Sequence, residues 1–96
     1  MSDVVAAAVK ALEAKLAGGA FDGSAKFVIE DEGALTLDAD GVRAGDRPAD
    51  VTLSADTETF EAILSGDLNP TTAFMSGRLK IDGDMGAALR LGSVLS

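Results

Sequence analysis

Four short segments of this sequence alternate apolar and polar side chains with a period of two, the pattern of β-strands that bury one face. They are residues 24–31, 34–39, 50–54 and 77–82. Because each has one apolar and one polar face, we predict a sheet covered by helices on a single side. Asp31-Glu32-Gly33 predicts a hairpin loop. A fifth, short edge strand is expected around residues 42–45, after Asp40-Gly41, a pair that favours a type I′ turn.

Helical periodicity accounts for most of the remaining chain. Apolar residues recur at three- and four-residue spacing within residues 3–17, 57–65 and 85–95. Asn69-Pro70, a cap followed by a first-turn proline, opens a further short helix. The expected order is α-β-β-β-β-α-α-β-α. We therefore predict that residues 1–96 form one two-layer α+β domain, in which a five-stranded sheet carries helices on one face.

Two of the longer helices begin at an aspartate that can accept hydrogen bonds from the first free amides, Asp56 and Asp84. In the last helix, one face holds Met85, Ala88, Leu89, Gly92 and Leu95, and Leu91 lies off it. We therefore expect this face to pack inward. Because they lie at the C-terminus, Leu91, Val94 and Leu95 are the apolar residues expected at the surface, where they would support a dimer.

The residue types that are missing exclude several kinds of chemistry. The sequence has no histidine, cysteine, tyrosine or tryptophan, so it lacks the usual nucleophile–base pairs and zinc or haem ligands. Asp38-Ala-Asp40-Gly41 resembles the start of a calcium loop, but the later positions of an EF-hand are not matched. We predict no catalytic residue, no metal site and no cofactor.

Charge and hydropathy narrow the partners and the location. The chain has 16 acidic and 8 basic residues and a formal net charge of −8, so it repels phosphate backbones and we expect no nucleic-acid partner. No stretch has the length of a membrane span, and the N-terminus lacks the pattern of a signal peptide. We expect no stable membrane insertion, a cytoplasmic location, and a monomer or homodimer.

The apolar residues leave two interpretations of the interior. The inner face of the predicted sheet presents large side chains, whereas the covering helices offer small ones such as Ala8, Ala62, Ala73, Ala88 and Gly92. Small residues opposite large ones permit close approach and a solid core. In the alternative interpretation, the small residues leave an apolar void between the layers, and such a void accepts an apolar ligand. Periodicity alone does not decide between the two.

Several runs of residues resemble the sterol-carrier-protein-2 domain. They include Gly33-Ala-Leu-Thr-Leu-Asp38, Ala49-Asp-Val-Thr-Leu-Ser54 and Gly66-Asp-Leu-Asn-Pro-Thr-Thr-Ala-Phe-Met75. The most specific is Gly77-Arg-Leu-Lys-Ile-Asp-Gly-Asp-Met-Gly86, which places a strand and a helix cap at fixed spacing. The resemblance covers residues 3–95. It implies a five-stranded sheet with helices on one face, and an apolar tunnel between the two layers.

The resemblance also implies a function and a set of residues. Proteins of that family bind fatty acids, fatty acyl-CoA and sterols without catalysis. The positions expected to line the tunnel here are Phe27, Ile29, Leu35, Leu53, Phe60, Leu64, Phe74, Met75, Leu79, Ile81, Met85 and Leu89. Family members often carry an aromatic residue where this chain has Leu35, so the width of the pocket is expected to differ.

We therefore expect non-catalytic binding or transfer of a hydrophobic lipid, with the headgroup near the tunnel mouth. Arg43, Arg47, Arg78 and Arg90 are the cations available to meet such a headgroup. The short helix 69–75 or the last helix is expected to move when ligand enters. The alternative is an accessory or interaction subunit of a lipid or quinone pathway, which uses the fold for protein contacts.

Overall fold

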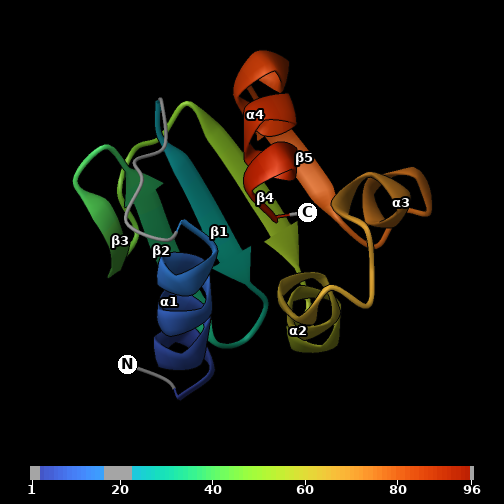
Figure 1. The fold of residues 1–96 in the computed structure, drawn as a ribbon, viewed down its shortest axis with the longest axis horizontal. Coiled ribbons are helices and arrows are strands. Elements are labelled where there is room, and N and C mark those ends of the chain that lie inside the picture. The colour runs from blue at the N-terminus through green and yellow to red at the C-terminus, as the bar shows by residue number, and fades with distance from the viewer. Residues whose placement is uncertain (1–2, 17–22, 96) are drawn as a thin grey trace.

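The computed structural model of the chain describes residues 3–16 and 23–95, of which residues 93–95 are described by backbone alone. The helices are α1 (Asp3–Leu16), α2 (Thr57–Ser65), α3 (Pro70–Met75) and α4 (Met85–Leu95). The strands are β1 (Ala25–Ile29), β2 (Gly33–Asp38), β3 (Gly41–Ala44), β4 (Val51–Ala55) and β5 (Lys80–Gly83). Their order along the chain (Figure 1) confirms the predicted α+β order.

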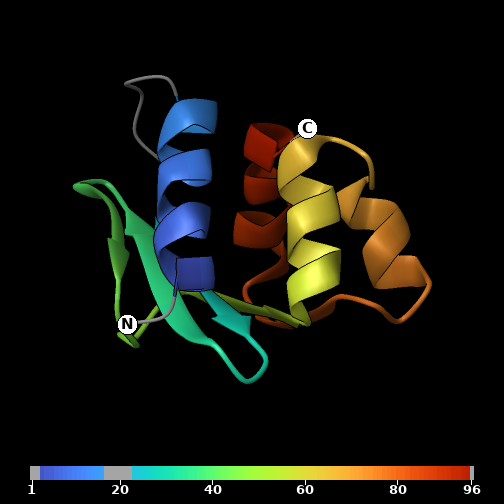
Figure 2. The same cartoon turned by 90° about the horizontal axis from the view of Figure 1, so that it is seen from below.

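The strands form one mixed sheet in the order β3-β2-β1-β4-β5. β1 and β4 are parallel, and the other neighbouring pairs are antiparallel. Buried and half-buried residues alternate along β1 and β4, as expected for a sheet with one covered face. Figure 2 shows the helices on one side of the sheet, which confirms the predicted layers.

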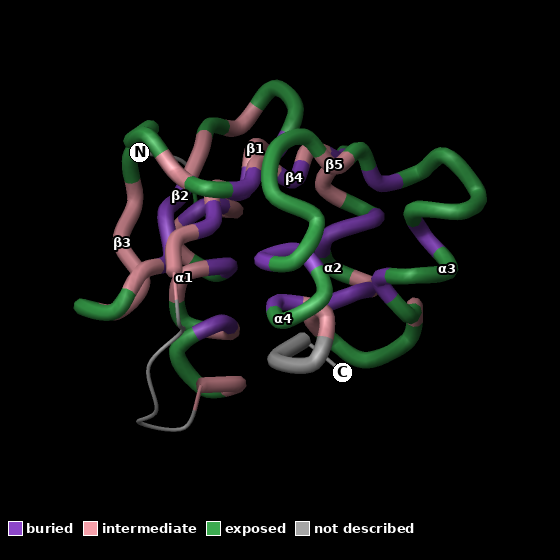
Figure 3. The backbone as a smooth tube through the Cα atoms, turned by 90° about the horizontal axis from the view of Figure 1, so that it is seen from above, coloured by how far each residue is buried: buried purple, intermediate pink, exposed green. Residues whose placement is uncertain are grey.

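The strand register places a row of apolar side chains across the sheet. Leu35 pairs with Phe27, Phe27 with Leu53, and Leu53 with Ile81. Phe27 meets Phe60 of α2 edge to face, with ring centroids 5.5 Å apart, a favourable aromatic geometry. Figure 3 shows that the buried positions of α1, α2 and α4 face the interior, whereas most of α3 is exposed. The core therefore lies under α1, α2 and α4.

The predicted helix caps are confirmed. Asp56 Oδ1 accepts a hydrogen bond from the Thr59 amide at 2.8 Å, and Asp84 Oδ1 accepts one from the Gly86 amide at 2.8 Å. Asn69 Oδ1 accepts one from the Thr71 amide at 2.8 Å. These bonds satisfy amides at helix starts that have no partner within the helix.

The last strand starts later than predicted, at Lys80 rather than at residue 77. The reason is a competing set of hydrogen bonds at the end of α3. The amides of Arg78 and Leu79 both donate to the Ala73 carbonyl, at 2.9 and 3.1 Å. These amides are therefore unavailable to the sheet, and they fasten α3 to the start of β5.

The predicted type I′ turn at Asp40-Gly41 is wrong. The register pairs Asp38 with Gly41, so the two loop residues are Ala39 and Asp40. Gly41 has a φ of +121°, but Asp40 does not have a positive φ. Asp38 Oδ1 accepts a hydrogen bond from the Asp40 amide at 2.9 Å. This side-chain bond holds an alternative turn, in which Gly41 alone takes the positive φ.

The expected exposure of Leu91 is also wrong, because this residue is fully buried. α4 is apolar over a broad arc, and Ala87, Ala88 and Leu91 form the part of it that packs into the core. The face predicted to point inward is instead partly open, since Leu89 is 73% exposed. The predicted surface residues Val94 and Leu95 have side chains outside the described residues.

Of the glycines whose surroundings the structure describes, Gly83 is the one whose replacement should cost the most stability. It has a φ of +111°, and an added Cβ would collide with the Asp50 carbonyl oxygen and lie 3.0 Å from Val51 Cα. We expect Gly83→Ala to lower the free energy of unfolding by more than Gly41→Ala. The latter is also strained at positive φ, at a cost of about 1–3 kcal/mol, but meets no atom within 4 Å. Urea denaturation of both variants measures the difference, and equal losses would contradict the expected clash.

Asp56 should make stability depend on pH. The Thr59 side chain and the Thr59 amide together hold the pKa of the Asp56 carboxyl below 3.8. The Thr59 hydroxyl is buried but makes no hydrogen bond of good geometry. A depressed pKa in the folded state stabilises the protein above pH 3.8, and this contribution is lost as the pH falls below that value and through the lower pKa of the folded state.

Asp56→Asn keeps a capping oxygen but removes the titration. Its melting temperature should therefore fall less than that of the wild type between about pH 5 and 3. Asp56→Ala should be less stable than Asp56→Asn across this range, because it removes the cap. Parallel pH profiles of the wild type and Asp56→Asn would contradict the assignment.

Candidate functional site

An open apolar groove of about 540 Å³ lies between α3, α4 and the β4–β5 edge of the sheet. We call it the α3–α4 groove. Its lining residues are Leu53, Pro70, Thr71, Phe74, Met75, Leu79, Ile81, Met85, Ala88, Leu89 and Gly92. Thr71 is the single polar side chain among them. The volume lies within the range of about 300–1,000 Å³ that is usual for small-molecule sites.

The groove exists because α4 carries apolar residues on two adjacent arcs. Residues 85, 88, 89 and 92 fall within about 100° of the helix circumference, and all four line the groove. Two of them, Ala88 and Gly92, are small. An added Cβ at Gly92 would meet no atom within 4 Å. The small residues therefore leave open space where a larger side chain would close it.

The opposite wall of the groove is the short helix α3, which is weakly embedded. Of its residues, Pro70 and Ala73 are buried. Phe74 and Met75 remain 42% and 81% exposed, although both line the groove. In Figure 1 this helix lies beyond the edge strand β5, away from α1. Few buried contacts hold it, so it is the element best able to shift when the groove fills.

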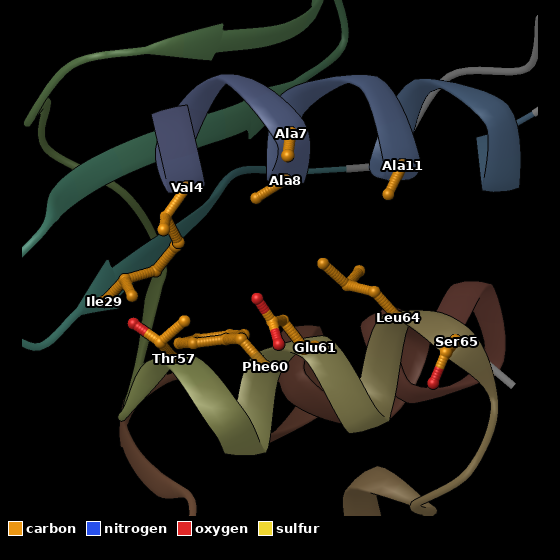
Figure 4. Close-up of a pocket in the computed structure, with 10 residues that line it drawn as sticks. All are labelled: Val4, Ala7, Ala8, Ala11, Ile29, Thr57, Phe60, Glu61, Leu64 and Ser65. Atoms are coloured by element: carbon orange, nitrogen blue, oxygen red, sulfur yellow. The ribbon is translucent and has the colours of Figure 1, made fainter. Parts of the chain in front are cut away.

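A second, smaller pocket of about 270 Å³ lies between α1 and α2, and we call it the α1–α2 cleft. In Figure 4, Ala7, Ala8 and Ala11 of α1 face α2, and Leu64 projects into the space between the helices. Glu61 lies at the same place and brings a carboxylate into the lining. The α1–α2 cleft is therefore smaller than the α3–α4 groove, and unlike the groove it has a charged side chain in its lining.

The structure distributes the twelve predicted lining residues over three places. Seven line the α3–α4 groove: Leu53, Phe74, Met75, Leu79, Ile81, Met85 and Leu89. Ile29, Phe60 and Leu64 line the α1–α2 cleft instead. Phe27 and Leu35 line neither pocket and are buried in the core. Ten of the twelve predicted residues thus divide between two pockets.

Some groove residues were not among the predicted set. Pro70, Thr71, Ala88 and Gly92 complete the lining. The signal for Ala88 and Gly92 was available, because both are small residues on the predicted inner face of the last helix. Pro70 and Thr71 belong to the first turn of α3, and their part in the wall follows from where that helix sits.

Within the described residues, the groove is lined by no charged side chain. None of the four predicted headgroup cations is in the lining. Arg43 lies on β3, where it pairs with Asp38 at 3.4 Å and Asp40 at 3.7 Å. Arg78 and Arg90 are sequence neighbours of lining residues and are exposed. The groove therefore offers apolar contact and no reactive group.

Two other kinds of site are absent from the residues that the structure describes. No group of three or more acidic, histidine or cysteine side chains lies close enough together to hold a metal ion. None of the described helices has both the length and the hydropathy needed to cross a membrane.

The fold is that of known sterol carrier proteins. Sterol carrier protein domain 2 of Helicoverpa armigera is 28% identical and superimposes with a TM-score of 0.77, over 96% of this chain and 85% of that one. Sterol carrier protein-2 from Aedes aegypti, solved in complex with palmitate, is 19% identical with a TM-score of 0.77, over 100% of this chain and 97% of that one.

A curated relative is much longer than this chain. Hydroxysteroid dehydrogenase-like protein 2 of Xenopus laevis is 48% identical over 63 residues, which are 64% of this chain and 15% of that protein. The sequence also matches the SCP-2 sterol transfer family over residues 5–96. That match spans nearly the whole fold, including both walls of the groove, and so this chain belongs to the SCP-2 sterol transfer family.

Proposed function

We propose that this chain binds and transfers long-chain lipids, of the fatty acid, fatty acyl-CoA or sterol-like class, in the α3–α4 groove. The acyl chain lies against Leu53, Leu79 and Ile81 at the floor, between the walls formed by α3 and α4. Each methylene that leaves water contributes about 0.8 kcal/mol. No bond of the lipid is made or broken.

One observation carries the proposal. Among the described residues, the large apolar side chains that are exposed are Phe74, Met75, Met85 and Leu89, and all four line the groove. A small chain that must bury its apolar residues to fold leaves these four open at a single place. Such a patch around a hollow is typical of a site that an apolar ligand completes.

Membership of the SCP-2 sterol transfer family supports a lipid ligand. The palmitate complex of the Aedes aegypti protein supports the same class, because its fold is shared. The three predicted lining residues in the α1–α2 cleft, Ile29, Phe60 and Leu64, offer a second apolar space. We propose the groove as the main site because it is larger and its lining carries no charged side chain.

The remaining parts of the proposal concern the setting in which the protein acts. Residues 1–96 work as one non-enzymatic domain without a cofactor, in the cytoplasm, as a monomer or homodimer. The net charge of −8 disfavours nucleic acid as a partner.

A second function is favoured by the relation to longer proteins. The matched part is 15% of the Xenopus laevis dehydrogenase-like protein, so the same fold occurs there next to other sequence. Under this alternative, the chain is an accessory or interaction subunit of a lipid or quinone pathway. A stable protein partner, together with a groove that binds no lipid, would favour it.

We expect a long-chain fatty acid to raise the melting temperature. A ligand that binds the folded state alone stabilises it by about 2.7 kcal/mol at one hundred times its dissociation constant. Differential scanning fluorimetry with palmitate measures the shift, and a short-chain acid such as butyrate is the control. Native mass spectrometry then counts the bound lipid. A melting temperature that no long-chain lipid changes would refute the carrier function.

A leucine at position 92 should close the groove without harming the fold. Gly92→Leu adds a side chain where a Cβ meets no atom within 4 Å, and it replaces a poor helix former. We expect unchanged or higher stability without ligand and at least tenfold weaker fatty-acid binding.

Gly92→Ala is the matched control for this variant. It makes the same backbone change but leaves most of the space open, so we expect fatty-acid binding close to that of the wild type. Titration with a fluorescent fatty acid compares the two variants. Equal affinities for Gly92→Leu and wild type would place the lipid elsewhere, with the α1–α2 cleft as the next candidate.

A further inference from the structure

The exposed apolar residues of the groove also form its rim. Met75 of α3 is 81% exposed and Leu89 of α4 is 73% exposed, which is more than residues need for contact with a ligand lying inside. Phe74 and Met85 are about half exposed beside them. We call these four residues the groove rim. A bound acyl chain would cover the floor of the groove, but it would leave the outermost side chains of the rim in water.

Charge is distributed unevenly along the sequence. Residues 1–65 contain thirteen acids and five bases, whereas residues 66–96 contain three of each. The whole formal net charge of −8 therefore lies in residues 1–65. Ten of the eleven groove residues belong to the neutral part. The rim is thus an apolar surface on the one electrically balanced segment of an acidic protein.

From this arrangement we propose that the groove rim docks on the surface of a zwitterionic lipid bilayer, where the groove takes up and releases its ligand. The inference rests on the proposed function, since a long-chain lipid must leave a membrane to enter the groove. On docking, Met75 and Leu89 enter the interface between headgroups and acyl chains, as the apolar residues of interfacial helices do. Residues 1–65 stay in water.

The charge distribution favours a bilayer over a second copy of the chain. Two copies that each carry −8 repel one another. A zwitterionic surface exerts no such repulsion. An anionic surface repels residues 1–65, and residues 66–96 have no excess of bases to offset this. The rim therefore suits phosphatidylcholine headgroups better than phosphatidylserine headgroups.

Vesicle flotation tests the docking surface. Wild-type protein should float with phosphatidylcholine vesicles, and its partition coefficient should fall when phosphatidylserine is added. Added salt should reduce that difference, because it screens the repulsion. Met75→Gln/Leu89→Gln should lower the partition coefficient for phosphatidylcholine at least tenfold. Glutamine is a good helix former, and both positions are exposed, so the fold should be kept.

The matched control is Ala14→Gln/Ala39→Gln, at two exposed positions outside the groove. It should partition within about twofold of the wild type. Tighter binding to phosphatidylserine than to phosphatidylcholine would overturn the inference. So would a wild-type dimer in analytical ultracentrifugation that Met75→Gln/Leu89→Gln dissolves, because the rim would then be covered by a second copy.

Binding of a fluorescent fatty acid by the wild type in solution, without vesicles, tests the proposed function separately. A protein that binds the fatty acid but does not float with vesicles overturns the docking inference alone. A protein that floats with vesicles but binds no fatty acid overturns the proposed function, while the docking surface stands.

Discussion

The structure depends on how one helix, α4, uses two adjacent apolar arcs. The inner arc, with Ala87 and Leu91, packs into the core. The neighbouring arc, with Met85, Leu89 and Gly92, faces the α3–α4 groove. A helix that is apolar over more than one face normally buries all of it. Here the sheet ends at β5 and α3 stands beyond that edge, so the second arc stays open.

The fold was largely predictable from the sequence because most of its signals are local. Alternation in the strands, together with caps such as Asp56 and Asn69, determined the order of the elements. Two local predictions failed where a competing hydrogen bond decided the conformation. Asp38 holds its own turn, and the Ala73 carbonyl takes the amides that were expected in the last strand. Neither of these hydrogen bonds changes the apolar–polar periodicity of its segment, so the sequence pattern did not indicate them.

The site was harder to predict than the fold, because a pocket depends on how the elements pack. Periodicity identified the apolar face of the last helix but not which part of it meets the core. Leu91 was therefore expected at the surface but is buried, whereas Leu89 was expected in the interior but is 73% exposed. The same limit explains why Phe27 and Leu35 are core residues. A position on the inner face of a sheet does not show whether a helix or a space lies above it.

The central claim is that an acyl chain lies in the α3–α4 groove, and two of the three methionines of the chain, Met75 and Met85, lie on that groove. Nuclear Overhauser effects between methyl-labelled methionine and a bound long-chain fatty acid test the claim most directly. We predict contacts from the acyl methylenes to the methyl groups of both Met75 and Met85. Contacts to the alanine methyl groups of the α1–α2 cleft, with none to these two methionines, would contradict it.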